Sequence, residues 1–208
     1  MENNEIVRQL VVAGFDPPSS LSLGYAVVAV NAEGFGELVG YGVELVEEDT
    51  GRRLLHIQDF TIDLVEQHGV NAMCFEMARG QGRTEVRERL GENTGVIKLV
   101  GAAYGMPIHA MATNHMAKML TGNGSNRKPK PGEPSKKTRT MRAARDLFFP
   151  GMSFKSISTR EDTGAENFEH IADACGFAVA YVLDAGFSIK GPGGILRPDS
   201  EGILEALQ

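Results

Sequence analysis

Two apolar runs in this chain of 208 residues each end in a carboxylic acid. Asp16 closes the run from Leu10 to Phe15, and Glu76 follows the apolar residues Met73, Cys74 and Phe75. Runs of this length, rich in apolar residues, are typical of buried strands. Burying an unpaired carboxylate is costly, so each acid indicates a partner cation or a shifted pKa. We expect both acids at the carboxyl ends of strands, where open α/β sheets place their sites.

A third apolar segment, near the carboxyl terminus, contains two more polar side chains. His170 and Asp173 interrupt a helix that we predict over residues 164–185. A spacing of three places both side chains on one face of a helix. If that face met the two strand ends, three carboxylates and an imidazole would converge. Such an oxygen-rich set suits Mg²⁺ or Mn²⁺, and the histidine can act as a nitrogen ligand or as a proton acceptor.

Each of these residues also has a simpler interpretation. Asp16 could cap a turn, Glu76 could pair with Arg79, and the pair His170 and Asp173 could be a satisfied polar contact in the core. It is their combination that favours a metal site. Two ions about 3.5–4 Å apart can activate a water and stabilise the leaving oxygen of a phosphodiester, so hydrolysis of nucleic acid is the predicted reaction.

The remaining pattern predicts a mixed α/β fold. Strands are expected at Val11–Asp16, Leu23–Asn31, Gly36–Val46, Val70–Glu76 and Met106–Ala112. The first three should form an antiparallel meander, and the last two should pair in parallel through a crossover helix. Further helices are expected at residues 52–68, 84–104, 113–120 and 136–148, with Thr113 or Asn114 capping the third of these.

The length of the chain suits one domain and is too short for two. We place this domain at residues 10–186, after an amino-terminal extension of residues 1–9. A basic insertion lies near residues 122–135, and residues 187–208 are predicted to form a flexible tail that contains glycine and proline.

Basic residues are concentrated in one segment of an otherwise acidic chain. Residues 113–145 contain nine lysines and arginines and one glutamate, a net charge of +8, so the rest of the chain has a net charge of −14. A basic band of this kind is typical of a protein that binds the phosphate backbone of nucleic acid. A solvated loop would have the same composition.

Membrane insertion and disulfide bonding are not expected. No apolar stretch reaches the roughly 18 residues of a membrane span, and residues 1–5 lack the layout of a signal peptide. We therefore expect a cytoplasmic protein with no membrane partner. Cys74 and Cys175 lie in apolar surroundings without a Cys-x-x-Cys spacing, and we predict that both are buried free thiols.

Three motifs resemble those of the RuvC-type Holliday junction resolvases. Residues 13–28, AGFDPPSSLSLGYAVV, resemble the opening of that family, in which the first strand ends in Asp-Pro-Gly and the second begins Gly-Tyr-Gly. Residues 75–79, FEMAR, resemble its second acidic strand end. Residues 170–174, HIADA, resemble its final helix, where a histidine or aspartate, two residues and an aspartate complete the metal site.

The resemblance spans residues 11–184 and implies an RNase H-like fold, in which a five-stranded mixed sheet is flanked by helices. It also implies a homodimer that cuts four-way DNA junctions by paired nicking. Two Mg²⁺ ions, replaceable by Mn²⁺, would be held by catalytic residues Asp16, Glu76, His170 and Asp173. The resemblance and the basic band together predict DNA contacts from Arg79, Lys118, Arg127, Lys128, Lys136, Lys137 and Arg139.

The chain departs from the family pattern at several positions. Pro18 replaces the usual glycine, Arg79 stands where the family has an aromatic residue, and residues 127–134 are an insertion. These departures fit a phage-encoded relative, which would act in the host cytoplasm. The alternatives are a less selective nuclease for branched or flap DNA, a small-molecule phosphate-binding ATPase-like domain of the same superfold, and a DNA-binding module without catalysis.

Overall fold

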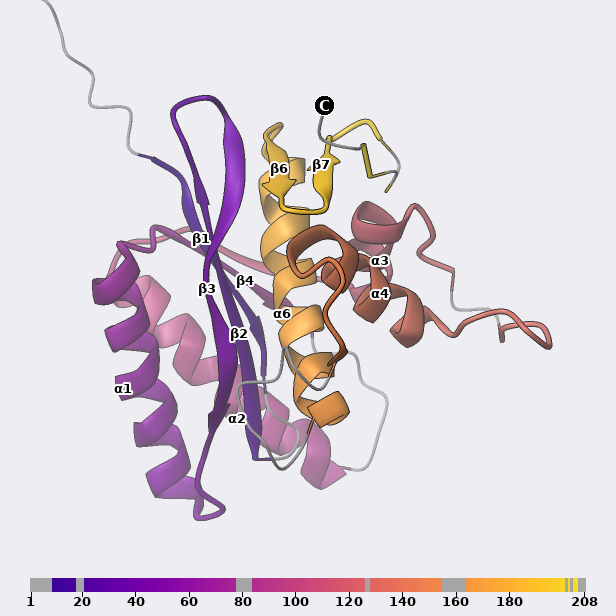
Figure 1. The fold of residues 1–208 in the computed structure, drawn as a ribbon. Helices are drawn as coiled ribbons and strands as arrows, with labels where there is room; N and C mark the ends of the chain where they lie inside the picture. Colours follow the sequence, from indigo (N-terminus) through magenta and orange to yellow (C-terminus); the bar gives the residue numbers. More distant parts are fainter. Residues whose placement is uncertain are drawn as a thin grey trace, which may run out of the picture.

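Strand β1 (Val11–Asp16) lies inside a seven-stranded mixed sheet in the computed structural model (Figure 1). The strand order is β5-β4-β1-β2-β3-β6-β7. The structure describes residues 9–17, 21–77, 84–125, 128–154, 164–200, 202, 204 and 205. The other strands are β2 (Ser22–Val30), β3 (Phe35–Leu45), β4 (Ala72–Glu76), β5 (Ile108–Met111), β6 (Ser188–Gly191) and β7 (Gly194–Leu196).

The predicted pairing of the first five strands is confirmed. β1, β2 and β3 form an antiparallel meander, whereas β4 pairs in parallel with β1 and β5 pairs in parallel with β4. The helices are α1 (Thr50–His68), α2 (Thr84–Ala103), α3 (Thr113–Thr121), α4 (Lys136–Phe148) and α6 (Gly164–Asp184). Each lies where its apolar periodicity predicts a helix.

Two helical layers cover the two faces of the sheet (Figure 1). α1 and α2 pack on one face, over a core that includes Phe15, Ile57 and Ile97. α3, α4 and α6 pack on the other face, over a core that includes Phe168 and Phe177. α6 is buried through most of its length, which agrees with its apolar sequence.

The backbone of α6 lies almost directly on β1 and β2. A Cβ atom added at Gly14 would be 2.2 Å from the carbonyl oxygen of Ala174, and one added at Gly24 would be 2.4 Å from the carbonyl oxygen of His170. No side chain fits in either gap. The two glycines therefore allow the helix to approach the sheet closely at the level of His170.

The sheet has seven strands, not the predicted five, and the two additional strands come from the segment predicted as a flexible tail. β6 pairs in parallel with β3, and β7 returns antiparallel to β6. Ile189 and Leu196 are buried there. Residues 191–194, Gly-Pro-Gly-Gly, suggested disorder, but they form the hairpin turn. Strands of four and three residues are too short to produce a recognisable alternation.

Three smaller expectations have clear outcomes. The helix cap predicted at Thr113 or Asn114 was wrong, because α3 begins at Thr113 after Ala112, which offers no side-chain hydrogen bond. Cys74 and Cys175 are buried and free, and burial raises the pKa of each thiol to about 12. Within the described parts of the chain, no helix has both the length and the apolarity of a membrane span.

We predict that Gly24→Ala destabilises the protein by about 1–3 kcal/mol, because the new methyl group would overlap the α6 backbone. Gly91→Ala is the matched control, since Gly91 lies in α2 with open space around its missing Cβ and should gain up to about 1 kcal/mol of helix propensity. Urea denaturation of both variants measures the difference. Equal stability of the two variants would contradict the close approach.

Candidate active site

Asp16 and Glu76 end adjacent parallel strands and face the same helix. The register pairs Phe15 of β1 with Phe75 of β4, and each acid is the next residue on its strand. Neighbouring strands lie about 4.8 Å apart, so the two acids are side by side at this edge. Both phenylalanines pack under α1 and α2. Because side chains alternate along a strand, the two acids point to the opposite face, which α6 covers.

α6 carries His170 directly over this sheet edge. His170 Nδ1 donates a hydrogen bond to Asp16 Oδ2 across 2.5 Å, linking residues that are 154 positions apart in sequence. Their side chains retain 25% and 16% of their exposure, so the pair is partly desolvated and still reachable from solvent. A bond this short between an imidazole and a carboxylate is charge-assisted. The alternative in which Asp16 serves only as a turn cap does not explain this contact.

The acids of the cluster lie close enough together to raise one another's pKa values. Burial raises the pKa of Asp173 well above its usual range, and the charges of Asp16, Glu169 and Glu76 raise it further. Burial also raises the pKa of Asp16, although the hydrogen bond from His170 opposes that rise. The pKa of His170 is raised, mainly by its bond to Asp16. Negative charge is therefore concentrated where water is scarce.

The donor set fits a hard divalent cation. Three carboxylates and one imidazole are the ligands that Mg²⁺ and Mn²⁺ accept, and a cation would offset the crowding that raises the acid pKa values. Among the described residues, no three histidine, cysteine, aspartate or glutamate side chains are already arranged as a metal site. Asp16 Oδ2 is instead engaged with His170 Nδ1, which leaves the other carboxylate oxygen and the other ring nitrogen outside this bond.

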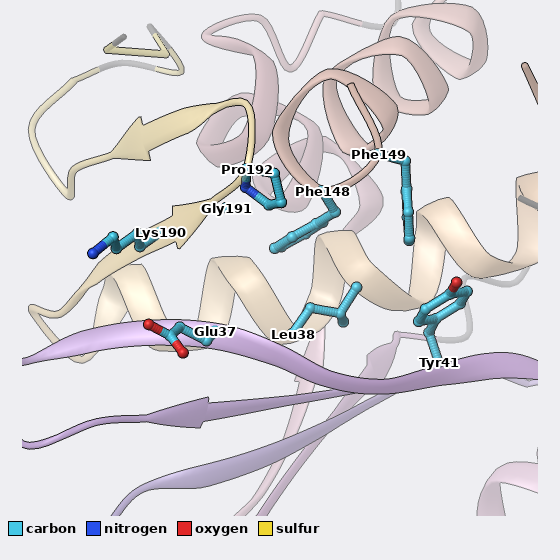
Figure 2. Close-up of a pocket in the computed structure, with 8 residues that line it drawn as sticks. All are labelled: Glu37, Leu38, Tyr41, Phe148, Phe149, Lys190, Gly191 and Pro192. Carbon is cyan, nitrogen blue, oxygen red and sulfur yellow. The ribbon is translucent and has the colours of Figure 1, made fainter. Parts of the chain in front are cut away.

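A pocket of about 450 Å³ lies between β3, the end of α4 and the turn that joins β6 to β7 (Figure 2). Its walls are largely aromatic and apolar, with Glu37 and Lys190 at one side. Through β2, the sheet register places Glu37 level with Val11, at the end of β1 opposite to Asp16. None of the four predicted catalytic residues lines this pocket. The pocket and the acidic cluster are therefore separate features of the structure.

Comparison with known proteins identifies the family. The family model described as Crossover junction endodeoxyribonuclease RuvC matches residues 12–131, more than half of the chain. The chain belongs to the RuvC family. This is a family of crossover junction endodeoxyribonucleases. The matched range includes Asp16 and Glu76 and ends before His170 and Asp173, so the assignment of the last two to the site depends on the packing of α6.

Solved structures share the RuvC fold with this chain. The Thermus thermophilus RuvC structure has a TM-score of 0.63 and 22% identity, covering 85% of this chain and 95% of that one. T. thermophilus RuvC in complex with Holliday junction substrate has a TM-score of 0.62, 19% identity and the same coverage. The yeast mitochondrial Holliday junction resolvase Ydc2 has a TM-score of 0.51 and 14% identity, covering 82% and 77%. No curated protein matches this chain in sequence.

In this RuvC-family chain, the predicted DNA-binding residues have different surroundings. Lys118 and Lys128 are exposed. Lys136 donates to Asn114 Oδ1 across 3.0 Å, which ties the first turn of α4 to α3. Arg139 is half-buried and donates to the carbonyl oxygen of Pro134, and its buried Nε has no hydrogen-bond partner within the described structure. Arg79 and Arg127, which were also predicted to contact DNA, lie outside the described residues.

Lys137 has an acidic partner that sequence reasoning missed. Its ammonium group forms an ion pair with Glu169, the residue before His170 on α6. The charge of Glu169 raises the pKa of Asp16, His170 and Asp173. The only sequence signal for a role of Glu169 was its position next to His170, a predicted metal ligand. On a helix, neighbours diverge by about 100°, so adjacency alone did not place Glu169 with the site.

We expect Asp173→Asn to stabilise the metal-free protein. Because burial raises the pKa of Asp173, this acid favours folding below its unfolded pKa and loses that contribution as pH rises toward the folded value. The asparagine side chain of the variant does not ionise, so the variant does not lose this stability as pH rises. Thermal melts in EDTA between pH 5 and pH 8 should give the variant a higher Tm, with the gain growing as pH rises. A gain of about 1 kcal/mol raises Tm by roughly 2–4 °C in a chain of this size.

Asp184→Asn is the control for this experiment, because Asp184 is at the far end of α6 in an exposed pair with His115. A melting temperature of Asp173→Asn that does not rise above that of the wild type at any pH would show that the charge of Asp173 is already compensated.

Proposed function

We propose that this chain is a metal-dependent endodeoxyribonuclease that resolves four-way (Holliday) DNA junctions by paired nicking. The proposal depends chiefly on one observation: Asp16 and Glu76 end adjacent strands under the helix that carries His170 and Asp173, in a chain of the RuvC family. A four-way junction has two equivalent strands to cut. We therefore propose that two copies of the chain act as a homodimer, with one site for each strand.

The four clustered residues have distinct proposed roles. Asp16, Glu76 and Asp173 would hold two Mg²⁺ ions, or Mn²⁺ in their place, with His170 as an additional ligand or as a proton carrier. When bound, the ions supply positive charge to the phosphodiester and lower the pKa of the attacking water. His170 holds a proton close to Asp16 in the metal-free protein, and can release it when that carboxylate becomes a ligand.

DNA contacts are proposed for the basic residues of α3, of α4 and of the segment between them. Lys118 lies on α3, and Lys136, Lys137 and Arg139 lie on α4, two helices that pack on the same face of the sheet as α6. Lys128 is exposed in the segment between these helices. Backbone contacts of this kind supply affinity without sequence information. T. thermophilus RuvC has been captured in complex with Holliday junction substrate, which supports a branched substrate for this chain too.

Cleavage of synthetic DNA tests the proposed function. We expect symmetric paired nicks in a four-way junction with Mg²⁺, no cleavage in EDTA, and little cleavage of a linear duplex or a flap. Asp16→Asn, Glu76→Gln and Asp173→Asn should each abolish cutting while junction binding persists, because binding depends on the basic surface. Equal cleavage of flap and junction would favour the less selective nuclease. A variant that still cuts with Mg²⁺ would remove its residue from the site.

Metal binding should tighten as pH rises. Asp16, His170 and Asp173 all have raised pKa values, so they retain protons that a cation must displace. We expect the affinity for Mn²⁺, measured by calorimetry, to rise between pH 6 and pH 8, with protons released on binding. His170→Asp keeps a ligand and removes the imidazole proton, so its pH dependence should be shallower. Identical profiles for the variant and the wild type would mean that His170 only packs against Asp16.

A further inference from the structure

An ion pair joins the basic helix α4 to α6, the helix that carries His170 and Asp173, at the edge of the acidic cluster. Lys137 Nζ, in the first turn of α4, contacts Glu169 Oε2, one residue before His170. The side chain of Lys137 is 59% exposed, whereas that of Glu169 is 24% exposed. The lysine therefore lies on the solvent side, where DNA would arrive, and the glutamate lies behind it.

Both charges act on the cluster itself. Lys137 lowers the pKa of Asp16, whereas Glu169 raises it. Glu169 already has a cation beside it, the ammonium group of Lys137. Position i−1 also turns Glu169 about 100° away from His170 around the helix, toward α4. Its geometry is that of a carboxylate that holds a lysine beside the cluster.

The negative charge of Glu169 would repel a DNA phosphate unless a cation is paired with it. A free lysine side chain loses rotamer entropy when it is immobilised. An ion pair formed before DNA binds has already met part of that cost, which is the general advantage of a preorganised site. The pair also keeps the ammonium group beside the carboxylates, where the phosphate to be cut must lie under the proposed function.

We infer that Glu169 is a positioning residue for cleavage: through its ion pair it holds the Lys137 ammonium group beside the cluster, in place to contact the phosphate of the strand that is cut. This inference rests on the proposed function. It assigns to Glu169 neither metal binding nor a contact with DNA. Its effect on cleavage passes entirely through Lys137.

A double-mutant cycle tests this inference. We would measure single-turnover cleavage of a four-way junction, at saturating protein and Mg²⁺, for Glu169→Gln, Lys137→Ala and the double variant. Glu169→Gln should cleave roughly tenfold more slowly, in line with the cost of a misplaced contact. Its junction affinity should be equal or tighter, because a negative charge has been removed. The double variant should be no slower than Lys137→Ala alone. Glu37→Gln is the control, because it removes an exposed acid from the end of β3 that is far from Asp16. Its cleavage rate should match that of the wild type.

Two results would overturn the inference. One is an unchanged cleavage rate in Glu169→Gln. The other is a further loss of rate when Glu169→Gln is added to Lys137→Ala, which would mean that the glutamate acts on the metal or the substrate independently. Glu169→Asp provides a second check, because a shorter carboxylate should recover part of the rate if pairing with the lysine is what matters.

A measurement without DNA separates this inference from the proposed function. The order parameter of the Lys137 ammonium group, measured by ¹⁵N NMR relaxation, should fall in Glu169→Gln and stay unchanged in Glu37→Gln. If the wild type cuts no junction, the proposed function fails. A fall in this order parameter in Glu169→Gln would still show that Glu169 restrains the Lys137 ammonium group. An unchanged order parameter contradicts the inference, whatever the nuclease activity.

Discussion

The close approach of α6 to β1 and β2 is the constraint on which the site depends. Gly14 and Gly24 leave no room for a side chain beneath the helix, so the backbone around His170 and Ala174 lies directly on the sheet. This contact lets His170 Nδ1 reach Asp16 Oδ2. A side chain at Gly14 or Gly24 would lift the helix, and Asp16 would then lose its contact with His170. The geometry of the site is thus set by two residues that have no polar chemistry of their own.

The cluster also concentrates like charge in a poorly hydrated place. Asp16 and Asp173 have raised pKa values because burial disfavours their ionised forms, and neighbouring acids add to the effect. Folding would be easier without these charges, which agrees with the catalytic role proposed for these residues. The Asp16–His170 bond relieves part of the conflict in the metal-free protein. A divalent cation would relieve more, which links metal affinity, pH and stability in one site.

The uneven distribution of charge along the chain also has a structural counterpart. α3 and α4, which carry basic residues, pack on the sheet face covered by α6, whereas α1 and α2 pack on the opposite face. Lys137 of α4 contacts Glu169 at the edge of the acidic cluster. An acidic site that must accept a polyanion needs such neighbours, because phosphate would otherwise be repelled. The pair formed by Lys137 and Glu169 is where the two sets of charge meet. The aromatic pocket near Glu37 and Lys190 is not part of this arrangement.

The sequence by itself determined the features that depend on local pattern. Apolar runs marked β1 and β4 and put Asp16 and Glu76 at their ends, and helical spacing put His170 and Asp173 on one face of α6. Only the tertiary structure decided which groups touch. The bond across 154 positions and the role of Glu169 as the partner of Lys137 arise from packing between distant elements, which no local periodicity encodes. The hairpin of β6 and β7 was missed for a related reason: strands this short are stabilised by pairing with β3 and not by their own sequence pattern.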